Sequence, residues 1–495
     1  MFFSVYTLGC KLNQLETEAI ADAFRRQGFT PVPIDAAAER PGVIVINTCT
    51  VTSMAEQKAR RVIRKALRRH PLAVIIVTGC YAQMDKTAII QLEAELSAEL
   101  SVEFPEEPLG RLFVVPGEKK DLIMDLPCLL KNTERNPESE SFLDKRAVEL
   151  ALRQVLAEPA AEPATPPSKG AFRFAPESFS SHSRAFIKIQ DGCDRRCAYC
   201  RVSIARGKSQ SLAASEVLKQ LKALEQRGFA EAVLTGVNIS QYRDSSMRLP
   251  GLLKLLLNGT EKIRLRLSSI EPELKLEPDP GEPESEFFEV LKNNRIRPHF
   301  HLSLQSGSAE VLAKMGRPYT PGDVEKAVER LRSIREDPFL ACDIITGFPG
   351  ETEDEFEKTL RLCEKIRFVW IHAFPFSPRP GTAAYDLPGK VSERDAVKRV
   401  ELLTELARKG RREYIGRWAG KEVEAVVEAP GRKDLKAVSG SDAKTSVSAV
   451  SENYLKLMVN CLERPIPQAG MPVRCRILRT SSGPFDALAE IIAER

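Results

Sequence analysis

Short, mostly apolar runs alternate with amphipathic stretches through the first part of the chain. Residues 3–8, 43–47 and 74–78 are apolar runs of strand length and predict buried β-strands. Between them, residues 16–27 and 53–70 repeat apolar positions at helical spacing. The order strand, helix, strand, helix, strand predicts a doubly wound, parallel αβ sheet.

The same alternation returns in the centre of the chain and changes near its end. Predicted strands lie at residues 184–190, 231–236, 263–268, 299–304, 341–347 and 370–375, with helical patterns between them. This repeat predicts a partial αβ barrel, in which reacting groups project from the carboxyl ends of the strands. From about residue 419 the pattern changes to short strands, which predicts a small antiparallel β-barrel.

A segment rich in Glu, Ser, Pro and Ala, residues 131–183, separates the first two regions. Its run at 158–168 predicts an extended linker. A short helix over residues 142–156 is also predicted, with an apolar face made by Val148, Leu150, Leu152 and Val155. We therefore expect an α/β protein with a doubly wound domain at 1–127, a linker or insertion at 128–178, a partial barrel domain at 179–410 and a β-barrel domain at 411–495.

Composition and charge narrow the class of protein. The 495 residues are 43% hydrophobic and 28% charged, which is enough apolar material for several cores. A net charge of +5 permits a nucleic-acid partner without requiring one. Eleven cysteines are too sparse for a disulfide scaffold, and neither a signal peptide nor an apolar run of membrane-spanning length is apparent. We expect a protein of the reducing cytoplasm with no membrane partner.

The five histidines are too scattered along the sequence to predict a catalytic triad or a histidine metal site. His299, His301 and His372 could line the barrel, but we expect them to be core histidines with satisfied partners. Asp343, within a predicted strand, is expected to accept a hydrogen bond from a nearby backbone donor.

Three cysteines within eight residues carry the strongest chemical signal. Cys193, Cys197 and Cys200 have the spacing C-x3-C-x2-C and follow the predicted strand at 184–190. Three thiolates hold three irons of a [4Fe–4S] cluster and leave the fourth iron open to a small molecule. A zinc site is less favoured, because no second cysteine pair or histidine pair lies nearby to complete four ligands.

Each predicted strand of the first region also ends at a cysteine, namely Cys10, Cys49 and Cys80. Because the carboxyl ends of parallel strands meet in one crevice, these thiolates could form a second cluster site. Gly9 and Gly79 would let the backbone approach a bulky cluster closely. The alternative is that each cysteine is a small buried hydrophobe, which is the usual role of a single cysteine at a strand end.

The run from Cys193 to Cys200, with Tyr199 before the last cysteine, resembles the radical S-adenosylmethionine (SAM) superfamily. The resemblance implies that these cysteines are catalytic, and that the open iron binds SAM and cleaves it to a 5'-deoxyadenosyl radical. By similarity, the residues expected to contact SAM are Tyr199, Thr235, Gly236, Ser269, Glu271, Gln305 and Ser306. Two departures from the family pattern put the contacts of one loop in doubt: Gln210 replaces the second Arg of an Arg-Gly-x-x-Arg-Ser element, and Ser203 stands where Pro is usual.

The motif at residues 9–17, with Asn47-Thr48-Cys49 and Thr78-Gly79-Cys80, resembles the amino-terminal domain of the methylthiotransferases, which use two [4Fe–4S] clusters. It is most similar to the subgroup that converts N6-threonylcarbamoyladenosine at position 37 of tRNA into its 2-methylthio derivative. That resemblance implies two uses of SAM, as methyl donor and as radical source. It also implies two partners, the tRNA anticodon stem-loop and a reducing donor such as flavodoxin or ferredoxin.

Three alternatives remain open at this point. A related enzyme could modify isopentenyladenosine in tRNA, or an aspartate of a ribosomal protein. A non-catalytic RNA-binding protein could instead use iron–sulfur clusters for structure alone, although an open iron argues against that interpretation.

The carboxyl-terminal pattern resembles the TRAM domain, an RNA-binding barrel. Arg474, Arg476 and Arg479 alternate along one predicted strand, and we expect them to share one face and bind RNA together with the basic helix at 58–69. Arg317 belongs to an element similar to Met-x-Arg-x-Tyr and is also predicted to bind RNA. Its planar fork suits a carboxylate or a phosphate, whereas an isolated Arg after a helix is more often solvated.

Overall fold

The computed structural model describes residues 1–36, 40–103, 111–133, 145–157, 170–177, 179, 183–272, 286–429, 446–461, 465–481 and 485–494. The chain divides into two compact units, each treated separately below. Unit 1 comprises Met1–Phe179, Asp191–Arg195 and Cys200–Ser209, and unit 2 comprises Ser180–Gln190, Arg196–Tyr199 and Gln210–Arg495. Within the described residues, no helix combines the length and the apolar character that a membrane crossing requires.

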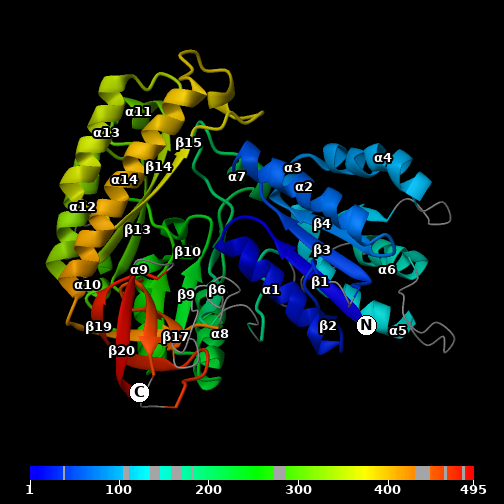
Figure 1. Cartoon of the computed structure of the whole chain (residues 1–495), viewed down its shortest axis with the longest axis horizontal. Helices are drawn as coiled ribbons and strands as arrows, with labels where there is room; N and C mark the ends of the chain where they lie inside the picture. Colours follow the sequence, from blue (N-terminus) through cyan, green and yellow to red (C-terminus); the bar gives the residue numbers. More distant parts are fainter. Residues whose placement is uncertain are drawn as a thin grey trace. The chain divides into compact units, whose positions relative to one another are not determined.

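Unit 1 is built on one parallel sheet (Figure 1). In spatial order its strands are β2 (Thr30–Pro31), β1 (Phe2–Thr7), β3 (Val43–Thr48), β4 (Val74–Gly79) and β5 (Leu112–Val114), and each neighbouring pair is parallel. The helices of the unit are α1 (Lys11–Arg26), α2 (Ser53–Arg69), α3 (Cys80–Met84), α4 (Lys86–Glu103), η1 (Gly117–Met124), α5 (Leu126–Thr133), α6 (Lys145–Ala157) and α7 (Val202–Arg206). The predicted doubly wound domain is confirmed.

Alternate residues of the central strands face opposite layers of helices. On β3, Val43 and Val45 pack with residues of α1, η1, α5 and α6, whereas Ile44 and Ile46 pack with residues of α2 and α4. All four side chains are fully buried. Since both faces of the sheet are covered, its strands read as continuous apolar runs rather than as alternating ones.

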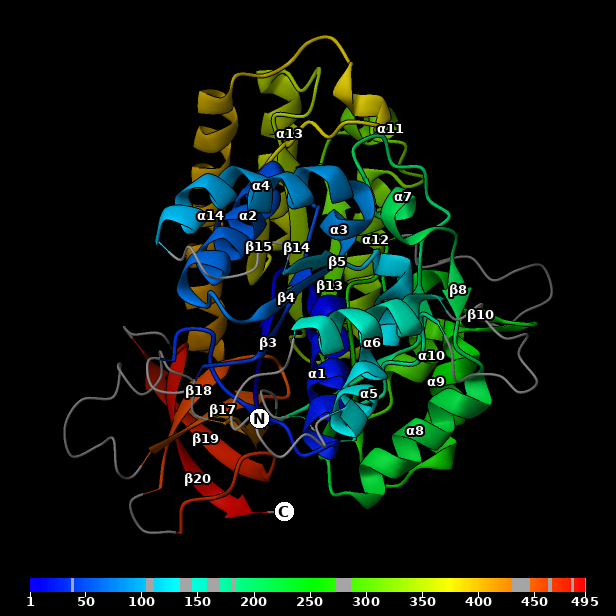
Figure 2. The same cartoon turned by 90° about the vertical axis from the view of Figure 1, so that its right-hand side faces the viewer.

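Helix α6 lies inside the segment expected to be a linker or insertion, and it confirms the short helix predicted there. Its buried side chains are Val148, Ala151, Leu152 and Val155, which follow the spacing of one helical face. Leu150, predicted to share that face, is 65% exposed, because two residues along a helix turn a side chain about 200° away. Helices α5 and α6 lie side by side (Figure 2). The predicted linker run at 158–168 is outside the described residues.

Unit 2 contains two parallel sheets that together form a partial barrel. One has β6 (Ala185–Lys188), β9 (Glu231–Thr235) and β12 (Arg264–Leu267), and the other has β13 (His299–Gln305), β14 (Phe339–Thr346) and β15 (Trp370–Pro375). Parallel bridges from Leu265 to Ile296 and from Ile270 to Leu302 join them. The predicted partial αβ barrel is therefore confirmed.

The remaining elements of this barrel are helices and short strands. The helices are α8 (Ala214–Gln226), η2 (Ile239–Gln241), α9 (Leu249–Gly259), α10 (Glu286–Leu291), α11 (Ala309–Lys314), α12 (Pro321–Ile334), α13 (Glu353–Ile366), η3 (Ala383–Tyr385) and α14 (Glu393–Trp418). The short strands are β7 (Gln190–Asp191), β8 (Gln210–Ser211), β10 (Arg243–Asp244) and β11 (Met247–Arg248). Helix α12 shows how these helices start: Thr320 and Asp323 cap each other's backbone N–H groups, and Pro321 follows the cap.

A small closed barrel ends the chain, as predicted. Its strands, in order around the ring, are β16 (Glu422–Val427), β17 (Ser446–Ser451), β18 (Lys456–Asn460), β20 (Ala487–Glu494) and β19 (Pro472–Thr480). All neighbouring pairs are antiparallel except β18 and β20, which are parallel. A closed ring with an odd number of strands cannot alternate direction throughout, so at least one pair must be parallel.

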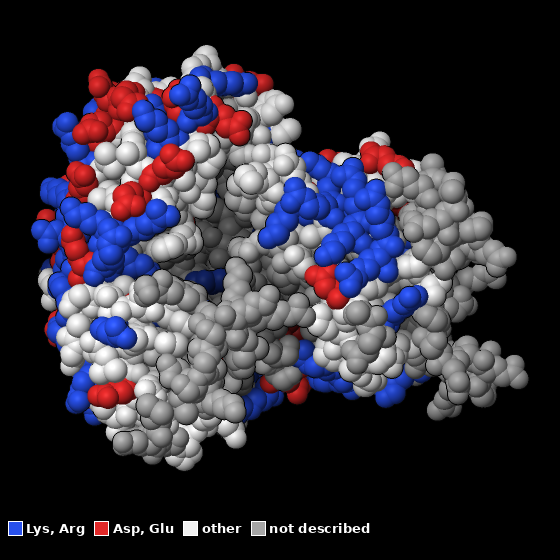
Figure 3. All heavy atoms as spheres, viewed as in Figure 1, with Lys and Arg blue, Asp and Glu red and all other residues white. Residues whose placement is uncertain are grey.

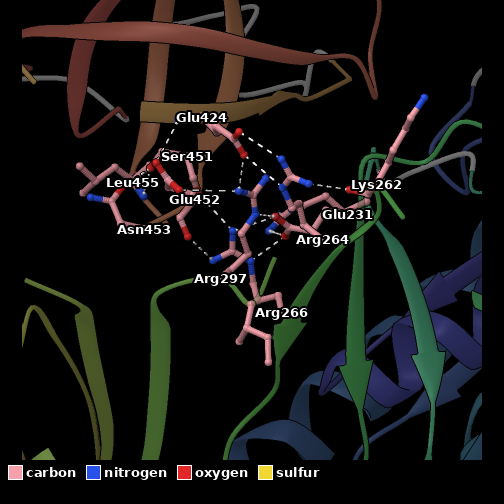
Figure 4. A network of polar contacts seen from close by, with 12 residues as sticks. Glu231, Lys262, Arg264, Arg266, Arg297, Glu424, Ser451, Glu452, Asn453 and Leu455 are labelled. Atoms are coloured by element: carbon pink, nitrogen blue, oxygen red, sulfur yellow. Dashed lines mark hydrogen bonds and ion pairs between the residues drawn. The ribbon is translucent and has the colours of Figure 1, made fainter. Parts of the chain in front are cut away.

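A buried ion network joins this small barrel to the αβ barrel (Figure 4). The fully buried carboxylate of Glu231 lies 2.6 Å from Nε of Arg266 and 2.8 Å from Nε of Arg297. Arg266 also donates to the backbone carbonyls of Ser451 and Glu452, each at 3.1 Å. Burial opposes the charge of Glu231, but the two guanidinium groups outweigh it and lower its pKa to about 2.

Replacing Glu231 by Gln should destabilise unit 2 by about 3–5 kcal/mol, because buried guanidinium groups would lose their counter-charge. Urea unfolding followed by tryptophan fluorescence measures this, since both tryptophans, Trp370 and Trp418, belong to unit 2. The matched control is Glu422→Gln, a half-exposed carboxylate paired with Arg474 at 2.8 Å, which should cost at most about 1 kcal/mol. Equal losses in the two variants would contradict the assignment.

The same network sets a pH dependence. Because the folded-state pKa of Glu231 is depressed, its contribution to stability is present above its ordinary value of 4.5 and is lost as the pH falls towards about 2. The Gln variant should lack this acid-dependent part of the loss.

Candidate functional site

The three strand-end cysteines of unit 1 lie at one edge of its sheet. Cys10 caps the start of α1 just after β1, Cys49 follows β3, and Cys80 begins α3 directly after β4. Because β1, β3 and β4 are neighbouring parallel strands, all three residues emerge at the same carboxyl edge. None is in a disulfide; Cys10 is exposed, and Cys49 and Cys80 are buried.

Two glycines let the backbone approach at this edge. Gly9 has φ 109°, and a Cβ there would lie 2.8 Å from Cβ and 3.0 Å from Sγ of Cys49. Gly79 has φ 97°, and a Cβ there would lie 2.4 Å from the backbone oxygen of Thr48. Any side chain at either position would clash, so glycine is required for the cysteine-bearing turns to come together.

The thiols at this edge share one electrostatic environment. Burial is the largest influence on Cys49, and together with the charges of Cys10 and Cys80 it raises the pKa of that thiol to about 12. The Cys49 thiol therefore resists ionisation unless a positive group binds it. A metal cluster supplies such charge, because coordinated thiols are deprotonated. The donor set and the close-packed turns fit a thiolate-bound iron–sulfur cluster.

Arg206 of α7 is a residue at this edge whose role sequence reasoning missed. Its guanidinium is 6% exposed and lies 2.9 Å from the buried carboxylate of Glu16 and 3.1 Å from Asp191. It also donates to Oδ1 of Asn13 at 2.9 Å. Burial opposes its charge, but Glu16, Cys80 and Asp191 raise the pKa of Arg206. The motif that follows Cys10 thus contributes its Asn and Glu to a buried pairing with the segment after Cys200.

The loop with Cys193, Cys197 and Cys200 is divided between the units. In unit 1, the backbone N–H of Cys193 donates to Gly207 O at 3.0 Å, and Val202 N lies 3.4 Å from Sγ of Cys200. Gly192 has φ 69°, and a Cβ there would overlap the backbone of Lys208. These contacts fix the two ends of the loop against the segment that follows it.

The middle of the loop belongs to unit 2, where Arg317 packs against it. Ala198 N donates to Met315 O at 3.0 Å, and the Arg317 guanidinium lies 5.9 Å from the Tyr199 ring centre. Arg317 is 7% exposed and pairs with Glu271 at 3.2 Å. Burial opposes its charge, but Tyr199, Tyr319, Cys197 and Glu271 raise the pKa of Arg317. The interpretation of Arg317 as a solvated residue is therefore wrong: its fork holds a carboxylate. Its predicted contact with RNA stays a prediction.

The other predicted SAM contacts lie at or just after the ends of barrel strands. Thr235 is the last residue of β9 and Gly236 follows it, while Gln305 ends β13 with a left-handed φ of 72°. Ser306, fully buried, lies with its Oγ 3.2 Å from Oγ1 of Thr359. Ser269 lies with its Oγ 3.4 Å from Nδ1 of His301. Their contacts with SAM remain predictions.

One cluster in unit 2 corrects the view that the histidines are too scattered to act together. Asp343 Oδ1 lies 3.1 Å from Nε2 of His301 and 3.6 Å from Nδ1 of His372. Burial opposes the charge of Asp343, but the two histidines lower its pKa. Asp343 was expected to serve a backbone donor; its partners are imidazoles instead. The residues are far apart in sequence but occupy successive strands, and strand register was the signal that sequence reasoning lacked.

Basic residues gather on α2 of unit 1 (Figure 3). The exposed members are Lys58, Arg61, Lys65, Arg68 and Arg69. Lys65 lies 2.7 Å from Asp35, and among the described residues Lys58 and Arg61 have no acidic partner. A helix with positive charges that are not neutralised suits a polyanion.

The basic strand of the small barrel is β19. Arg474 and Arg476 are exposed, and both pair with Glu422, at 2.8 and 3.5 Å. Simple alternation would turn Arg479 to the other face, but a register shift between Ile477 and Arg479 leaves it exposed too. A bulge of this kind adds one residue and restores the shared face.

Two family models match the chain. The model of the Radical SAM superfamily matches residues 187–363, which include the Cys193 loop. The model of the uncharacterized protein family UPF0004 matches residues 3–100, which include Cys10, Cys49 and Cys80. The class of protein is therefore a radical SAM enzyme with an additional amino-terminal domain.

Relatives extend this match to nearly the full length. The threonylcarbamoyladenosine tRNA methylthiotransferase MtaB of Treponema pallidum (strain Nichols) is 39% identical, over 96% of this chain and 97% of its own. The Thermotoga maritima protein of the same name is 34% identical, over 86% of each chain. A tRNA-2-methylthio-N(6)-dimethylallyladenosine synthase of Thermotoga petrophila is 29% identical, over 91% of this chain and 90% of its own.

This chain belongs to the family of threonylcarbamoyladenosine tRNA methylthiotransferases. It is an enzyme, and its cofactors are SAM and two [4Fe–4S] clusters. Membership confirms the enzyme rather than the binding-only interpretation of the sequence.

Replacing one cysteine of either trio by Ala should remove about half of the iron of the reconstituted protein, because a cubic cluster needs all three thiolates. We expect this for Cys49→Ala and for Cys197→Ala, with about four irons lost from about eight. Iron and sulfide assays after anaerobic reconstitution measure it. Cys128→Ala, at an exposed cysteine of α5, is the control and should keep full iron content. Loss of all iron, or of none, in the Cys49 variant would contradict two separate sites.

Proposed function

We propose that this enzyme converts N6-threonylcarbamoyladenosine at position 37 of tRNA into its 2-methylthio derivative. The observation that carries the proposal is the 39% identity to a protein of that name over 96% of the chain. The two cysteine trios support it, because they supply thiols for the two clusters that the resemblance to methylthiotransferases implies. The enzyme would act in the cytoplasm, where tRNA is available.

We assign one cluster to Cys10, Cys49 and Cys80, and the other, catalytic cluster to Cys193, Cys197 and Cys200. When bound, the second cluster and SAM would supply a 5'-deoxyadenosyl radical that takes up a hydrogen atom, and a further SAM would supply a methyl group to sulfur carried at the first cluster. Electrons would come from a donor such as flavodoxin or ferredoxin. The chain's own part is to orient these groups and exclude water.

The proposed SAM contacts are the strand-end residues of the partial barrel. Tyr199 and Glu271 adjoin Arg317. The other five lie at or just after the ends of β9, β12 and β13: Thr235, Gly236, Ser269, Gln305 and Ser306. Support comes from their position, because reacting groups in αβ barrels project from the carboxyl ends of the strands.

The substrate base is proposed to enter from the anticodon stem-loop. Unstacking a loop nucleotide costs a few kcal/mol, less than extracting a base from a duplex. Isopentenyladenosine is the second candidate substrate, supported by the relative named for dimethylallyladenosine. That relative is 29% identical to this chain, whereas the Treponema pallidum relative named for threonylcarbamoyladenosine is 39% identical.

Mass spectrometry of tRNA nucleosides tests the substrate. A strain that lacks this gene should lose 2-methylthio-N6-threonylcarbamoyladenosine and accumulate the unmodified threonylcarbamoyl nucleoside. Plasmid-borne wild type should restore the product, whereas Cys49→Ala should not. A product level unchanged by the deletion, or loss of the isopentenyl derivative instead, would remove the first choice.

The basic surfaces lead to a separate prediction for tRNA binding. Neutralising Lys58 and Arg61 together should weaken binding and reduce the slope of log affinity against log salt by about 1 to 2, because each phosphate contact releases about one counterion. The control is Lys219→Ala with Lys222→Ala, two exposed lysines of α8, which should leave the slope unchanged. Filter binding of tRNA at several salt concentrations measures the slope for each double variant. The same assay on Arg474→Ala with Arg476→Ala tests the predicted role of the small barrel.

A further inference from the structure

One face of β15 presents a row of three partly exposed aromatic rings. Trp370, His372 and Phe374 occupy alternate positions, and each is at least 38% exposed, while Ile371 between them is buried. Their rings touch edge to face, with centres 5.7 Å apart for Trp370 and His372 and 6.4 Å for His372 and Phe374. Exposed aromatic side chains along a strand are a common platform for stacking nucleobases.

A polar group lies beside the centre of this row. His372 is opposite Asp343 on β14, and Asp343 is held between His372 and His301 at 3.6 and 3.1 Å. On the other side of His301, the Oγ of Ser269 lies 3.4 Å from Nδ1 of the imidazole. With Nδ1 of His372 facing Asp343, its Nε2 is left for a ligand, and the side chain is 48% exposed.

The same face leads to the loop that carries Cys197. Ile345, two residues after Asp343 and opposite Phe374, packs in a cluster with Met315, against which Ala198 and Tyr199 also pack. Two residues along a strand span about 7 Å. Asp343 therefore lies one such step along β14 from Ile345, whose cluster contacts this part of the cysteine loop.

The opposite end of this face is closed. Arg411 of α14 lies 4.9 Å from the Trp370 ring centre, and Tyr454 stacks on His299 at 4.1 Å between ring centres. Phe339 and Ala341 belong to a core cluster with Tyr414 and residues of the small barrel. What remains accessible is the half of the face nearer the cysteine loop.

We propose that this face is the subsite for the substrate base, and that His372, backed by Asp343, determines which N6 substituent is accepted. The aromatic row stacks the purine, and the His372–Asp343 pair hydrogen-bonds a polar substituent on N6. An apolar N6 group of similar size would leave these polar atoms desolvated and unpaired, which a site built for hydrogen bonding rejects strongly. The inference rests on the proposed function and deepens it, because it explains selection of the threonylcarbamoyl group over an isopentenyl group.

The test compares anticodon stem-loop RNAs that differ only at position 37, bound to the reconstituted full-length enzyme. One carries N6-threonylcarbamoyladenosine and the other N6-isopentenyladenosine. His372→Phe keeps an aromatic ring but removes the polar atoms. It should weaken binding of the threonylcarbamoyl RNA and strengthen binding of the isopentenyl RNA, which lowers the ratio of the two affinities about tenfold or more. Phe374→Ala should weaken binding of both RNAs by about 5-fold or more and leave the ratio of the two affinities within about twofold. Stacking on the purine does not depend on the N6 substituent.

An unchanged affinity ratio in His372→Phe would overturn the inference, as would an equal loss on both RNAs. So would a stoichiometric zinc content in the wild type that His372→Phe abolishes, because the cluster would then be a metal site. Turnover of the wild type on the threonylcarbamoyl RNA, followed by product mass, tests the proposed function separately. A wild type that discriminates between the RNAs but forms no product would count against the reaction and not against the subsite.

Discussion

The direction of the strands in a parallel sheet is the constraint on which the rest of this structure depends. Side chains that follow β1, β3 and β4 must emerge at one edge, so Cys10, Cys49 and Cys80 meet without any motif that brings them close in sequence. The partial barrel obeys the same rule for Thr235 and Gln305. Chemistry is thus concentrated at the carboxyl edges, while in unit 1 helices cover both faces of the sheet.

Much of this arrangement follows from residue patterns alone. Continuous apolar runs predicted the strands of unit 1, because Ile44 and Val45 are buried on opposite faces. The strand-end cysteines could be predicted to converge for the same reason. Arg206, in contrast, has partners at residues 13, 16 and 191, and nothing in its local sequence indicates a buried guanidinium. The His301, Asp343 and His372 cluster depends on strand register, which hydrophobic periodicity does not determine.

The limits of pattern reasoning are also visible in single positions. Leu150 is as apolar as Leu152, but two residues turn a helical side chain by about 200°, so Leu150 is exposed while Ala151 and Leu152 are buried. On β19, alternation predicts the orientation of Arg476 but not that of Arg479, because a bulge inserts one residue between them. Local insertions change the face of a side chain without any change in composition.

Buried charge has a comparable role in both units. Glu231 joins the small barrel to the αβ barrel through guanidinium groups, and Glu16 joins the Cys10 motif to Arg206 and, at 2.5 Å, to Lys120. Such networks add little net stability compared with apolar packing, but an unpaired member is strongly unfavourable, so they permit few other arrangements. Within unit 1, Arg206 contacts Asp191, two residues before Cys193, and also Asn13 and Glu16, three and six residues after Cys10. One guanidinium therefore connects the segment that follows Cys10 to the segment that precedes Cys193. Apolar contacts of equal energy would fix these two segments with less geometric precision.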